Sequence, residues 1–435
     1  MSIFFSIIVP VYNSENTIKK TLDSIKKQSL KNIEVLIIND NSIDKSSKII
    51  QKFKKKSNNV KIIDNKKNLG VSVSRNRGLK VSKGNYIIFL DSDDILLKGS
   101  LEYLKEKIEK NNNNFYFIKS KDLRKDFIDH NEVYYNKKKK NNFSSHIKSY
   151  FHFRPTCWNF ICKKDFLIKI KLNFFNIRLY EDQIFASKLI NSTKNFAILS
   201  KPIYGRVTEN PNSLGKTIGK YLGLSCLKCI LELIKLIEKN NINLSHPDYE
   251  YMISRINFLL QDFNLNIISS NTKDIKKYSE FIFLNQKLFL KIKKYNFNNK
   301  MFYFLNTAYF VKKKKEIHKL ILNNKNYEIK KIIKKFNQPE KSLNYLFCAN
   351  QVSKIIGIVC KKNNIQLNGI IDNNRYFKNK FIHQNKIFNE KHLKIKINKG
   401  HKTNILICNL EKQLIQSLKN NLPIKKNLNI SNIIS

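Results

Sequence analysis

Residues 86–94 read Tyr-Ile-Ile-Phe-Leu-Asp-Ser-Asp-Asp, a short apolar run that ends in three carboxylates within four positions. The run has the length and composition of a buried β-strand. Three further segments share this character: Ser6–Tyr12, Ile33–Asp40 and Val60–Asp64. Between them, apolar residues recur at helical spacing, so strands alternate with helices. This order predicts a mostly parallel α/β sheet with helices on both faces.

The expected helices begin after polar residues that can cap them. Ser14 is the expected N-cap of the first helix, the second follows Ser42, and the third runs from about Val71 to Gly84. In parallel sheets, ligands bind at the carboxyl ends of the strands. Three of these ends carry polar residues: Tyr12-Asn13, Asn39-Asp40 and Asp91-Ser92-Asp93-Asp94. We therefore expect a ligand site at this edge.

The composition bounds the class of protein. The chain has 435 residues, of which 42% are hydrophobic, so it can bury a core and is not a disordered chain. Its 82 Lys and Arg against 33 Asp and Glu give a net charge of +49. Such a surface attracts phospholipid headgroups, nucleic acid or nucleotide phosphates. Because Lys is abundant everywhere, a general compositional drift also accounts for part of the charge, which alone does not choose among these partners.

The length predicts several domains. We expect a first domain over residues 1–215, a basic helical region over 216–336, and a small α/β domain over 337–435. Residues 312–335 hold ten Lys against two Glu, which makes them a candidate surface for an anionic membrane, with a solvated helix face as the equal alternative.

The last hundred residues return to alternation between strands and helices. Expected strands are Leu343–Phe347, Gln366–Ile371 and Thr403–Cys408, and expected helices are Val352–Lys362 and Glu411–Asn420. This order is typical of a Rossmann-like unit, in which Asp372 has the place of a ribose-binding acid. The turn over residues 348–353 contains no Gly, so the phosphate-binding loop of that fold is not matched.

The acidic cluster is the strongest chemical signal. Asp91, Asp93 and Asp94 repel one another, and a divalent cation would relieve that repulsion. Carboxylate oxygens suit Mg²⁺ or Mn²⁺, whose sites commonly combine one or two carboxylates with substrate phosphates. The alternative is a set of acidic residues at the start of a helix.

Four motifs in chain order carry a resemblance to a known family. They are Ser6–Glu15, Val35–Asp44, Asn68-Leu69-Gly70 with Ser74-Arg75-Asn76-Arg77-Gly78, and Gly84–Asp94. In this order and spacing they resemble the family 2 glycosyltransferases of the GT-A fold. The resemblance continues through Cys157-Trp158-Asn159 and Tyr180–Phe185 and covers about residues 1–213.

This resemblance implies transfer of a sugar from a nucleotide diphosphate to an acceptor hydroxyl, with inversion at the anomeric carbon. It implies that Asp182, of the pair Glu181-Asp182, is the base that accepts the hydroxyl proton; a helix N-terminal acid is the alternative. It further implies that Asp93 binds the metal, that Asp91 contacts ribose or metal, and that Asp94 assists them.

The resemblance also assigns a nucleotide pocket. There Tyr12 stacks on the base, Pro10 shapes the turn, and Asp40 accepts a hydrogen bond from the base. Glu15 and Arg75 are weaker candidates. Arg75 is placed to meet a phosphate, with an exposed residue on an amphipathic helix as the alternative.

Two departures from the family pattern are visible. Asn41 replaces a Gly that is commoner there, but Asn tolerates a left-handed turn. Phe160 replaces a Lys, a change that we expect to affect only the preference for acceptor or sugar. No Gln-x-x-Arg-Trp motif follows Asp182, and no stretch is long and apolar enough to span a bilayer, so we expect single addition rather than polymerisation.

The expected donor is a UDP-sugar, and the expected acceptor is a saccharide or a lipid-linked glycan in bacterial surface-polysaccharide synthesis, such as capsule or lipooligosaccharide. The start of the chain lacks a basic n-region, and the seven Cys are few and scattered, so we expect a cytoplasmic protein, peripheral on the inner face of the membrane. Nucleic acid is not the expected partner. The alternatives are a basic nucleic-acid- or membrane-binding protein, or a scaffold, that retains an inactive transferase domain.

Overall fold

The computed structural model describes four long segments and several short ones. They are residues 3–123, 156–206, 222–287 without 247, and 314–336, followed by 343–347, 356–357, 359–361, 363–371, 381–382, 385–388, 403–407 and 428–432. Contacts divide the chain into two compact units. Unit 1 comprises Met1–Thr217 with Lys228–Leu259, and unit 2 comprises Ile218–Leu227 with Leu260–Ser435. The division into three domains stays a prediction.

Unit 1 is built on an eight-stranded sheet in the order β3-β2-β1-β4-β7-β6-β8-β5. Its first four strands are all parallel: β1 Phe5–Val11, β2 Ile33–Asn39, β3 Val60–Asp64 and β4 Tyr86–Phe89. Alternating apolar runs and helical segments therefore form the parallel α/β sheet that the sequence predicts.

Beyond β4 the sheet is mixed. The remaining strands are β5 Asp94–Leu96, β6 Phe115–Asp122, β7 Phe160–Lys163 and β8 Phe196–Arg206. Strand β7 runs antiparallel to β4 and β6, β5 runs antiparallel to β8, and β6 runs parallel to β8. Strand β5 follows β4 after only four residues, so the acidic cluster connects a central strand of the sheet to the strand at its edge.

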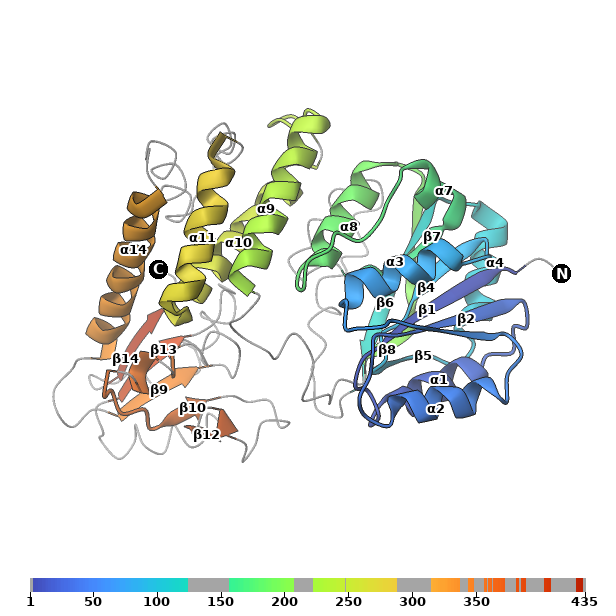
Figure 1. The fold of residues 1–435 in the computed structure, drawn as a ribbon, viewed down its shortest axis with the longest axis horizontal. Helices are drawn as coiled ribbons and strands as arrows, with labels where there is room; N and C mark the ends of the chain where they lie inside the picture. The colour runs from blue at the N-terminus through green and yellow to red at the C-terminus, as the bar shows by residue number, and fades with distance from the viewer. Residues whose placement is uncertain are drawn as a thin grey trace. The chain divides into compact units, whose positions relative to one another are not determined.

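The helices of unit 1 cover both faces of the sheet. Helices α1 (Ile18–Lys26) and α2 (Ser46–Lys54) lie side by side on one face, and α3 (Val71–Val81) lies on the other (Figure 1). Three more helices follow along the chain: α4 Ser100–Asn111, α7 Lys164–Lys169 and α8 Glu181–Asn191. A sheet covered in this way has apolar residues on both sides, as parallel strands require.

The expected cap of the first helix is wrong. Helix α1 begins at Ile18, after Thr17, and the Ser14 carbonyl accepts a hydrogen bond from the Ile18 N–H at 2.9 Å. The Ser14 hydroxyl does not cap the helix because it bonds to the hydroxyl of Ser92 at 2.8 Å. The second helix likewise begins at Ser46, three residues later than Ile43.

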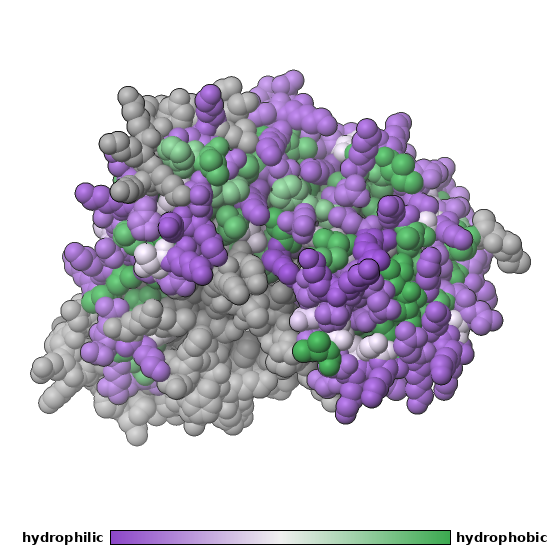
Figure 2. All heavy atoms as spheres, in the orientation of Figure 1, coloured by the Kyte–Doolittle hydropathy of each residue, from purple (hydrophilic) through white to green (hydrophobic). Residues whose placement is uncertain are grey.

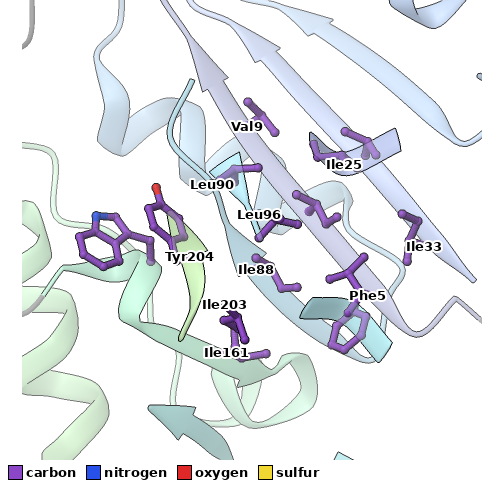
Figure 3. Packing of buried hydrophobic residues seen from close by; sticks show 14 of the residues in the cluster. Phe5, Val9, Ile25, Ile33, Ile88, Leu90, Leu96, Ile161, Ile203 and Tyr204 are labelled. Carbon is purple, nitrogen blue, oxygen red and sulfur yellow. The ribbon is translucent and has the colours of Figure 1, made fainter. Parts of the chain in front are cut away.

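The core of unit 1 gathers around the central strand. All seven residues of β1 are buried, and Phe5 and Val9 pack there with Ile88 of β4 and Ile161 of β7 (Figure 3). On the visible surface, hydrophilic residues predominate over unit 1, with only small apolar areas between them (Figure 2). The core therefore fixes the strands whose ends carry the predicted site.

Helix α3 lies unusually close to β1 at one position. A Cβ atom added at Gly78 would lie 2.4 Å from Cγ2 of Ile8, a distance that side chains do not tolerate. The absence of a side chain at this position therefore sets how closely the helix approaches the sheet.

Part of the later helical region completes unit 1. Helices α9 (Leu222–Lys239) and α10 (Tyr249–Ser269) each contribute residues to both units. Within unit 1, the hydroxyls of Tyr251 and Ser187 bond at 3.1 Å, and the Cys229 thiol donates to the Tyr180 carbonyl at 3.8 Å. Helix α8 is therefore packed from residues 228–259 as well as from the sheet.

Unit 2 contains a second sheet, in the order β11-β12-β10-β9-β13-β14, which is parallel except for the β11–β12 pair. Its strands are β9 Leu343–Phe347, β10 Gly369–Ile371, β11 Phe381–Ile382, β12 Asn385–Phe388, β13 Thr403–Ile407 and β14 Leu428–Asn432, and its helices include α11 Thr272–Leu284 and α14 Lys314–Phe336. The three expected strands are present. The Rossmann-like assignment stays a prediction, and Asp372 and the expected helix 411–420 lie outside the described residues.

Two findings, on membrane-spanning helices and on cysteines, apply to the described residues alone. Among them, no helix combines the length and the apolar character needed to cross a membrane. The five described cysteines are buried and free, at positions 157, 162, 226, 229 and 360.

Replacing Gly78 by Val should lower the free energy of unfolding by about 1–3 kcal/mol, because the new side chain forces α3 away from Ile8. Chemical denaturation measures this change. Lys80→Val, at an exposed position of the same helix, is the matched control for the helix propensity of Val and should cost roughly 0.5 kcal/mol. Equal losses in the two variants would contradict the close approach.

Candidate functional site

The three predicted strand ends meet at one edge of the sheet. Val11 pairs with Asn39, and the Asp40 N–H donates to the Val11 carbonyl at 2.8 Å. On the other side of β1, the Leu90 N–H donates to the Ile8 carbonyl at 3.0 Å, which places Asp91 next to the end of β1. The polar ends of β1, β2 and β4 are therefore neighbours, as expected.

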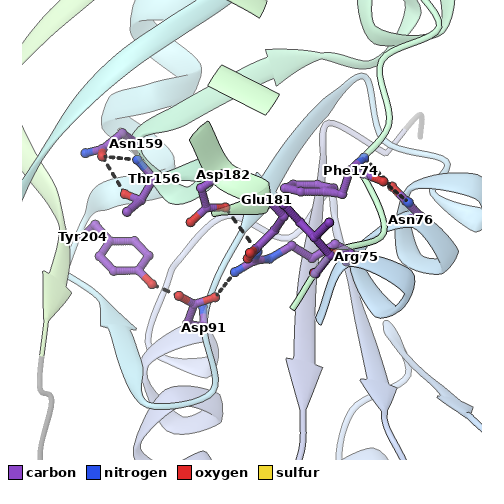
Figure 4. Close-up of polar contacts among 11 residues, drawn as sticks. Arg75, Asn76, Asp91, Thr156, Asn159, Phe174, Glu181, Asp182 and Tyr204 are labelled. Atoms are coloured by element: carbon purple, nitrogen blue, oxygen red, sulfur yellow. Dashed lines mark hydrogen bonds and ion pairs between the residues drawn. The ribbon is translucent and has the colours of Figure 1, made fainter. Parts of the chain in front are cut away.

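Arg75 lies at the centre of this site. Its guanidinium nitrogen NH2 lies 2.8 Å from Oδ1 of Asp91, and NH1 lies 2.8 Å from Oε1 of Glu181 and 3.2 Å from Oδ1 of Asp182 (Figure 4). These carboxylates come from the end of β4 and from the first turn of α8. One cation thus joins two motifs that lie far apart in the sequence.

The alternative of an exposed Arg75 is wrong. Arg75 is 3% exposed, and its guanidinium is occupied by carboxylates. The helical pattern that places it on α3 was correct, but the face it occupies is turned toward the edge of the sheet. A buried cation needs such partners, because an unpaired charge in the interior costs several kcal/mol, of order ~3–5.

A second layer supports the guanidinium. The Phe174 ring lies against Arg75, with the guanidinium carbon 5.2 Å from the ring centroid. The Asn76 side-chain amide donates to the Phe174 carbonyl and accepts from the Phe174 N–H, both at 2.8 Å (Figure 4). The neighbouring residue on α3 therefore holds the ring that packs on Arg75.

Burial and charge set the protonation of the cluster. Burial by itself lowers the pKa of Arg75, but the surrounding acids outweigh it and raise that pKa well above its ordinary value. Burial, followed by repulsion from Asp182, raises the pKa of Glu181 to about 8. Burial likewise raises the pKa of Asp182, which Arg75 opposes and Asp91 reinforces. The N-terminus of α8 also favours negative charge there.

Tyr204 of β8 fixes the loop over Asp91–Asp94 by two hydrogen bonds. The Tyr204 hydroxyl accepts from the Asp91 N–H at 3.2 Å (Figure 4). It donates to Oδ2 of Asp94 at 2.9 Å. The ring of this fully buried tyrosine stacks on Trp158, with centroids 4.5 Å apart. Asp94 is 3% exposed and begins β5, so its carboxylate is turned toward Tyr204.

The two other carboxylates of this loop are the candidate ligands of a divalent cation. Asp91 keeps 28% of its side chain exposed and uses Oδ1 for Arg75, and Asp93 is partly exposed two residues on. Mg²⁺ or Mn²⁺ sites commonly need no more than one or two carboxylates together with substrate phosphates. Among the described residues, no group of three or more His, Cys, Asp or Glu side chains forms a complete metal site.

Asp40 is built into the loop that follows β3. Its Oδ1 accepts from Asn65 Nδ2 at 2.6 Å and from the Leu69 N–H at 2.8 Å, and its Oδ2 accepts from the Gly70 N–H at 2.8 Å. Gly70 has φ of 92°, a left-handed conformation that glycine adopts without strain. The motif Asn68-Leu69-Gly70 is therefore anchored on Asp40, and Oδ2, which accepts a single bond, retains capacity for one more.

The β1 loop joins the two sides of the site. Tyr12 is 47% exposed at the end of β1, and Pro10 is buried within that strand. Glu15 braces the next loop, because its N–H donates to Asp44 at 3.0 Å and its Oε2 accepts from the Lys45 N–H at 2.9 Å. The Ser14–Ser92 hydroxyl bond then links this loop directly to the acidic loop.

Several residues of the site were missed by the sequence analysis. Asn65 follows β3, and polar residues at strand ends were the signal that could have found it. Tyr204 and Phe174 gave no such signal, because their partners are distant in sequence. The left-handed turn expected at Asn41 is confirmed, with φ of 61°.

Comparisons with known proteins agree with this geometry. The chain is 28% identical over 289 residues to the minor teichoic acid biosynthesis protein GgaB of Bacillus subtilis, covering 64% of this chain and 31% of GgaB. It is 44% identical over 103 residues to glycosyltransferase GlyA of Streptococcus pneumoniae, covering 24% of this chain and 15% of GlyA. The chain thus spans less than a third of either relative.

A solved structure shares the fold. The chain superposes on residues 1–349 of S. aureus TarS in complex with UDP-GlcNAc with a TM-score of 0.54 and 19% identity, covering 74% of this chain and 92% of that one. The sheet, parallel over β1 to β4 and mixed beyond, together with this likeness identifies the GT-A fold. Residues 6–184 match Glycosyl transferase family 2, and this part of the chain belongs to that family.

Replacing Arg75 by Met should destabilise the protein by about 3–5 kcal/mol near pH 8, because three carboxylates lose their cation. Near pH 5 the loss should be smaller. In the unfolded chain Glu181 and Asp182 have ordinary pKa values, whereas in the folded variant burial keeps both pKa values raised. The free energy of unfolding therefore falls as the pH rises from the unfolded-state pKa values to the folded-state ones. Denaturation at the two pH values measures this difference.

The control for this experiment is Lys105→Met, which removes a cation from the surface pair with Glu109. Its effect should stay within about 1 kcal/mol at both pH values. A loss in Arg75→Met that does not depend on pH would contradict the electrostatic role of Arg75.

Replacing Tyr204 by Phe should cost about 1–3 kcal/mol and loosen the acidic loop, because Asp94 and the Asp91 N–H lose one buried partner. Hydrogen exchange should accelerate at the amides of residues 91–95 beyond the change in global stability. Tyr116→Phe removes another buried hydroxyl, which contacts Asn113 and Ile108, and should lower stability without this local effect. The same exchange rates in both variants would refute the role of Tyr204.

Proposed function

We propose that this protein is an inverting glycosyltransferase that moves a sugar from a UDP-sugar to a hydroxyl of a saccharide or lipid-linked glycan. The observation that carries the proposal is the convergence of Asp91, Glu181 and Asp182 on Arg75, beside the strand ends that hold Tyr12 and Asp40. A donor pocket and a candidate base are thereby joined in one site. The family membership of residues 6–184 supports the same activity.

The donor nucleotide would lie over the ends of β1 and β2. Tyr12 offers an exposed ring on which a base can stack, and Oδ2 of Asp40, a residue that is only 3% exposed, has acceptor capacity left for the imide of uracil. Glu15 would hold the shape of this loop by its bonds to the loop of Asp44, whereas Pro10 lies within β1 and not in the turn where the sequence analysis expected it. The UDP-GlcNAc in the TarS structure of the same fold supports a UDP-linked donor.

Asp93 and Asp91 would hold a Mg²⁺ or Mn²⁺ ion together with the donor diphosphate, and the ion would supply neutralisation of the leaving phosphates. The protein side of this site is fixed by Tyr204 below the loop and by Ser14 beside it. Arg75 keeps the exposed carboxylate of Asp91 directed toward the strand ends instead of leaving it free to rotate.

Asp182 would act as the base. Its carboxylate removes the proton from the acceptor hydroxyl as the acceptor oxygen attacks the anomeric carbon. The bond from that carbon to the diphosphate oxygen breaks on the opposite face, and its electron pair leaves with the nucleoside diphosphate, which inverts the configuration. A pKa raised by burial suits a base that works near neutral pH, and Glu181 would hold Arg75 in register beside it.

The acceptor would belong to a cell-surface glycopolymer. The similarity to GgaB, a teichoic acid biosynthesis protein, supports this class of pathway. Such acceptors are often assembled on lipid carriers, so we place the protein in the cytoplasm, peripheral on the inner membrane face. The net charge of +49 supports an anionic membrane as partner.

The test is a donor panel. The purified protein is mixed with UDP-, GDP-, dTDP- and CMP-sugars, with Mn²⁺ or with EDTA, and thermal stabilisation and donor hydrolysis are measured. We expect metal-dependent stabilisation and slow hydrolysis with the UDP-sugar class. No response to any donor would overturn the proposal.

Replacing Asp182 by Asn should abolish sugar transfer, by about 100-fold or more, and leave UDP-sugar binding within about two-fold, because the amide cannot accept the proton. Asp165→Asn, at an exposed position in the first turn of α7, is the control and should leave both unchanged. Unchanged turnover in the Asp182 variant would refute its assignment as base.

A further inference from the structure

Two helices of unit 1 carry a strongly positive surface. Helices α1 and α2 with their flanking residues, 18–31 and 45–56, contain eleven Lys and one acidic residue, Asp23, and the carboxylates of Glu15 and Asp44, which precede the helices, bond to backbone N–H groups of the loops. All eleven lysines are exposed: Lys19, Lys20, Lys26, Lys27, Lys31, Lys45, Lys48, Lys52, Lys54, Lys55 and Lys56. We call this surface the α1–α2 lysine face. In Figure 2 the part of the surface over α1 and α2 is mostly hydrophilic.

A general drift toward Lys does not explain this face, because another helix of the same unit is balanced. Helix α4 contains three Lys and three Glu. Its lysines are paired with its own acids, as in Lys105–Glu109 and Lys110–Glu106. On the lysine face only Lys19 has such a partner within the helix, in Asp23. Among the described helices, the α1–α2 lysine face therefore carries a net positive charge that α4 does not.

The residue types favour a diffuse anionic surface over a specific polyanion. Every cation of the two segments is Lys, and none is the Arg that bidentate phosphate recognition favours. The one aromatic residue there, Phe53, packs against the core, so the face has no stacking platform for single-stranded nucleic acid. Ile43, just before α2, is 84% exposed and adds an apolar side chain at the rim, as interfacial surfaces do.

We propose that the α1–α2 lysine face docks this protein on an anionic lipid bilayer. Each Lys near such a surface contributes roughly 1 kcal/mol, so part of the face suffices for stable binding. Both helices begin near the sheet edge that carries the site, because the loops after β1 and β2 lead into them. Lys19, Lys20 and Lys45 therefore lie toward that edge, and the lysines at the ends of the two helices lie toward the opposite one. A lipid-linked acceptor is part of the proposed function, on which this step rests. With such an acceptor, docking would bring the enzyme to the membrane surface that carries it.

The experiment is sedimentation of the full chain with vesicles. Vesicles of phosphatidylcholine alone are compared with vesicles that contain about 30% phosphatidylglycerol, at low salt and at about 0.5 M NaCl. We expect binding to the anionic vesicles only, and its loss at high salt. The variant Lys26→Gln, Lys52→Gln, Lys54→Gln should weaken that binding about ten- to hundred-fold.

A charge-matched control separates this face from the total charge. Lys80→Gln, Lys83→Gln, Lys169→Gln removes three exposed lysines of unit 1 outside the lysine face and should change vesicle binding less than about two-fold. Equal weakening in both triple variants would overturn the proposal, as would equal binding to neutral vesicles. Binding to an oligonucleotide without binding to anionic vesicles would also overturn it. The donor panel is read in the absence of vesicles, so a failure of docking is distinguishable from a failure of the transferase assignment.

Discussion

The site depends on one buried cation shared by three carboxylates. Arg75 is 3% exposed, and Asp91, Glu181 and Asp182 all lie within 3.2 Å of its guanidinium. Bringing these acids together without it would leave like charges close together in a largely buried place, where water reaches them only in part. Arg75 therefore connects α3 to the loop after β4 and to the first turn of α8. The ring of Phe174 packs on the guanidinium, and the Asn76 amide holds Phe174 in position by hydrogen bonds to its backbone.

A second constraint comes from loops that bind one another rather than a ligand. Asp40 uses both oxygens to hold the loop of Leu69 and Gly70, and Ser14 reaches from the β1 loop to Ser92 in the acidic loop. Such bonds order the loops at the edge of the sheet before any substrate binds. Binding therefore costs less conformational entropy than it would with loops that are not ordered in advance. The stretches that resemble family 2 glycosyltransferases are thus also the stretches that assemble the edge.

The sequence predicted what depends on local pattern. The strands β1 to β4 were found because each is a short apolar run, and the left-handed turn at Asn41 was found because few residues adopt it. The central position of Arg75 was not found, because its partners Glu181 and Asp182 lie more than a hundred residues away and the helical pattern of α3 fits an exposed residue equally well. The role of Tyr204 was not predicted, because its partner Asp91 is also distant in sequence. The prediction that Ser14 caps the first helix was wrong, because its hydroxyl bonds to Ser92 instead.

The packing of α8 has a practical consequence for dissecting the chain. Residues 228–259 complete unit 1, and Tyr251 and Cys229 contact Ser187 and Tyr180 at the helix that presents Glu181 and Asp182. A fragment cut where the family resemblance ends would uncover the buried side of that helix and leave apolar surface facing water. Truncations meant to isolate the transferase part should therefore extend at least through the end of α10 at Ser269, and shorter fragments are poor starting material for soluble expression or crystallisation.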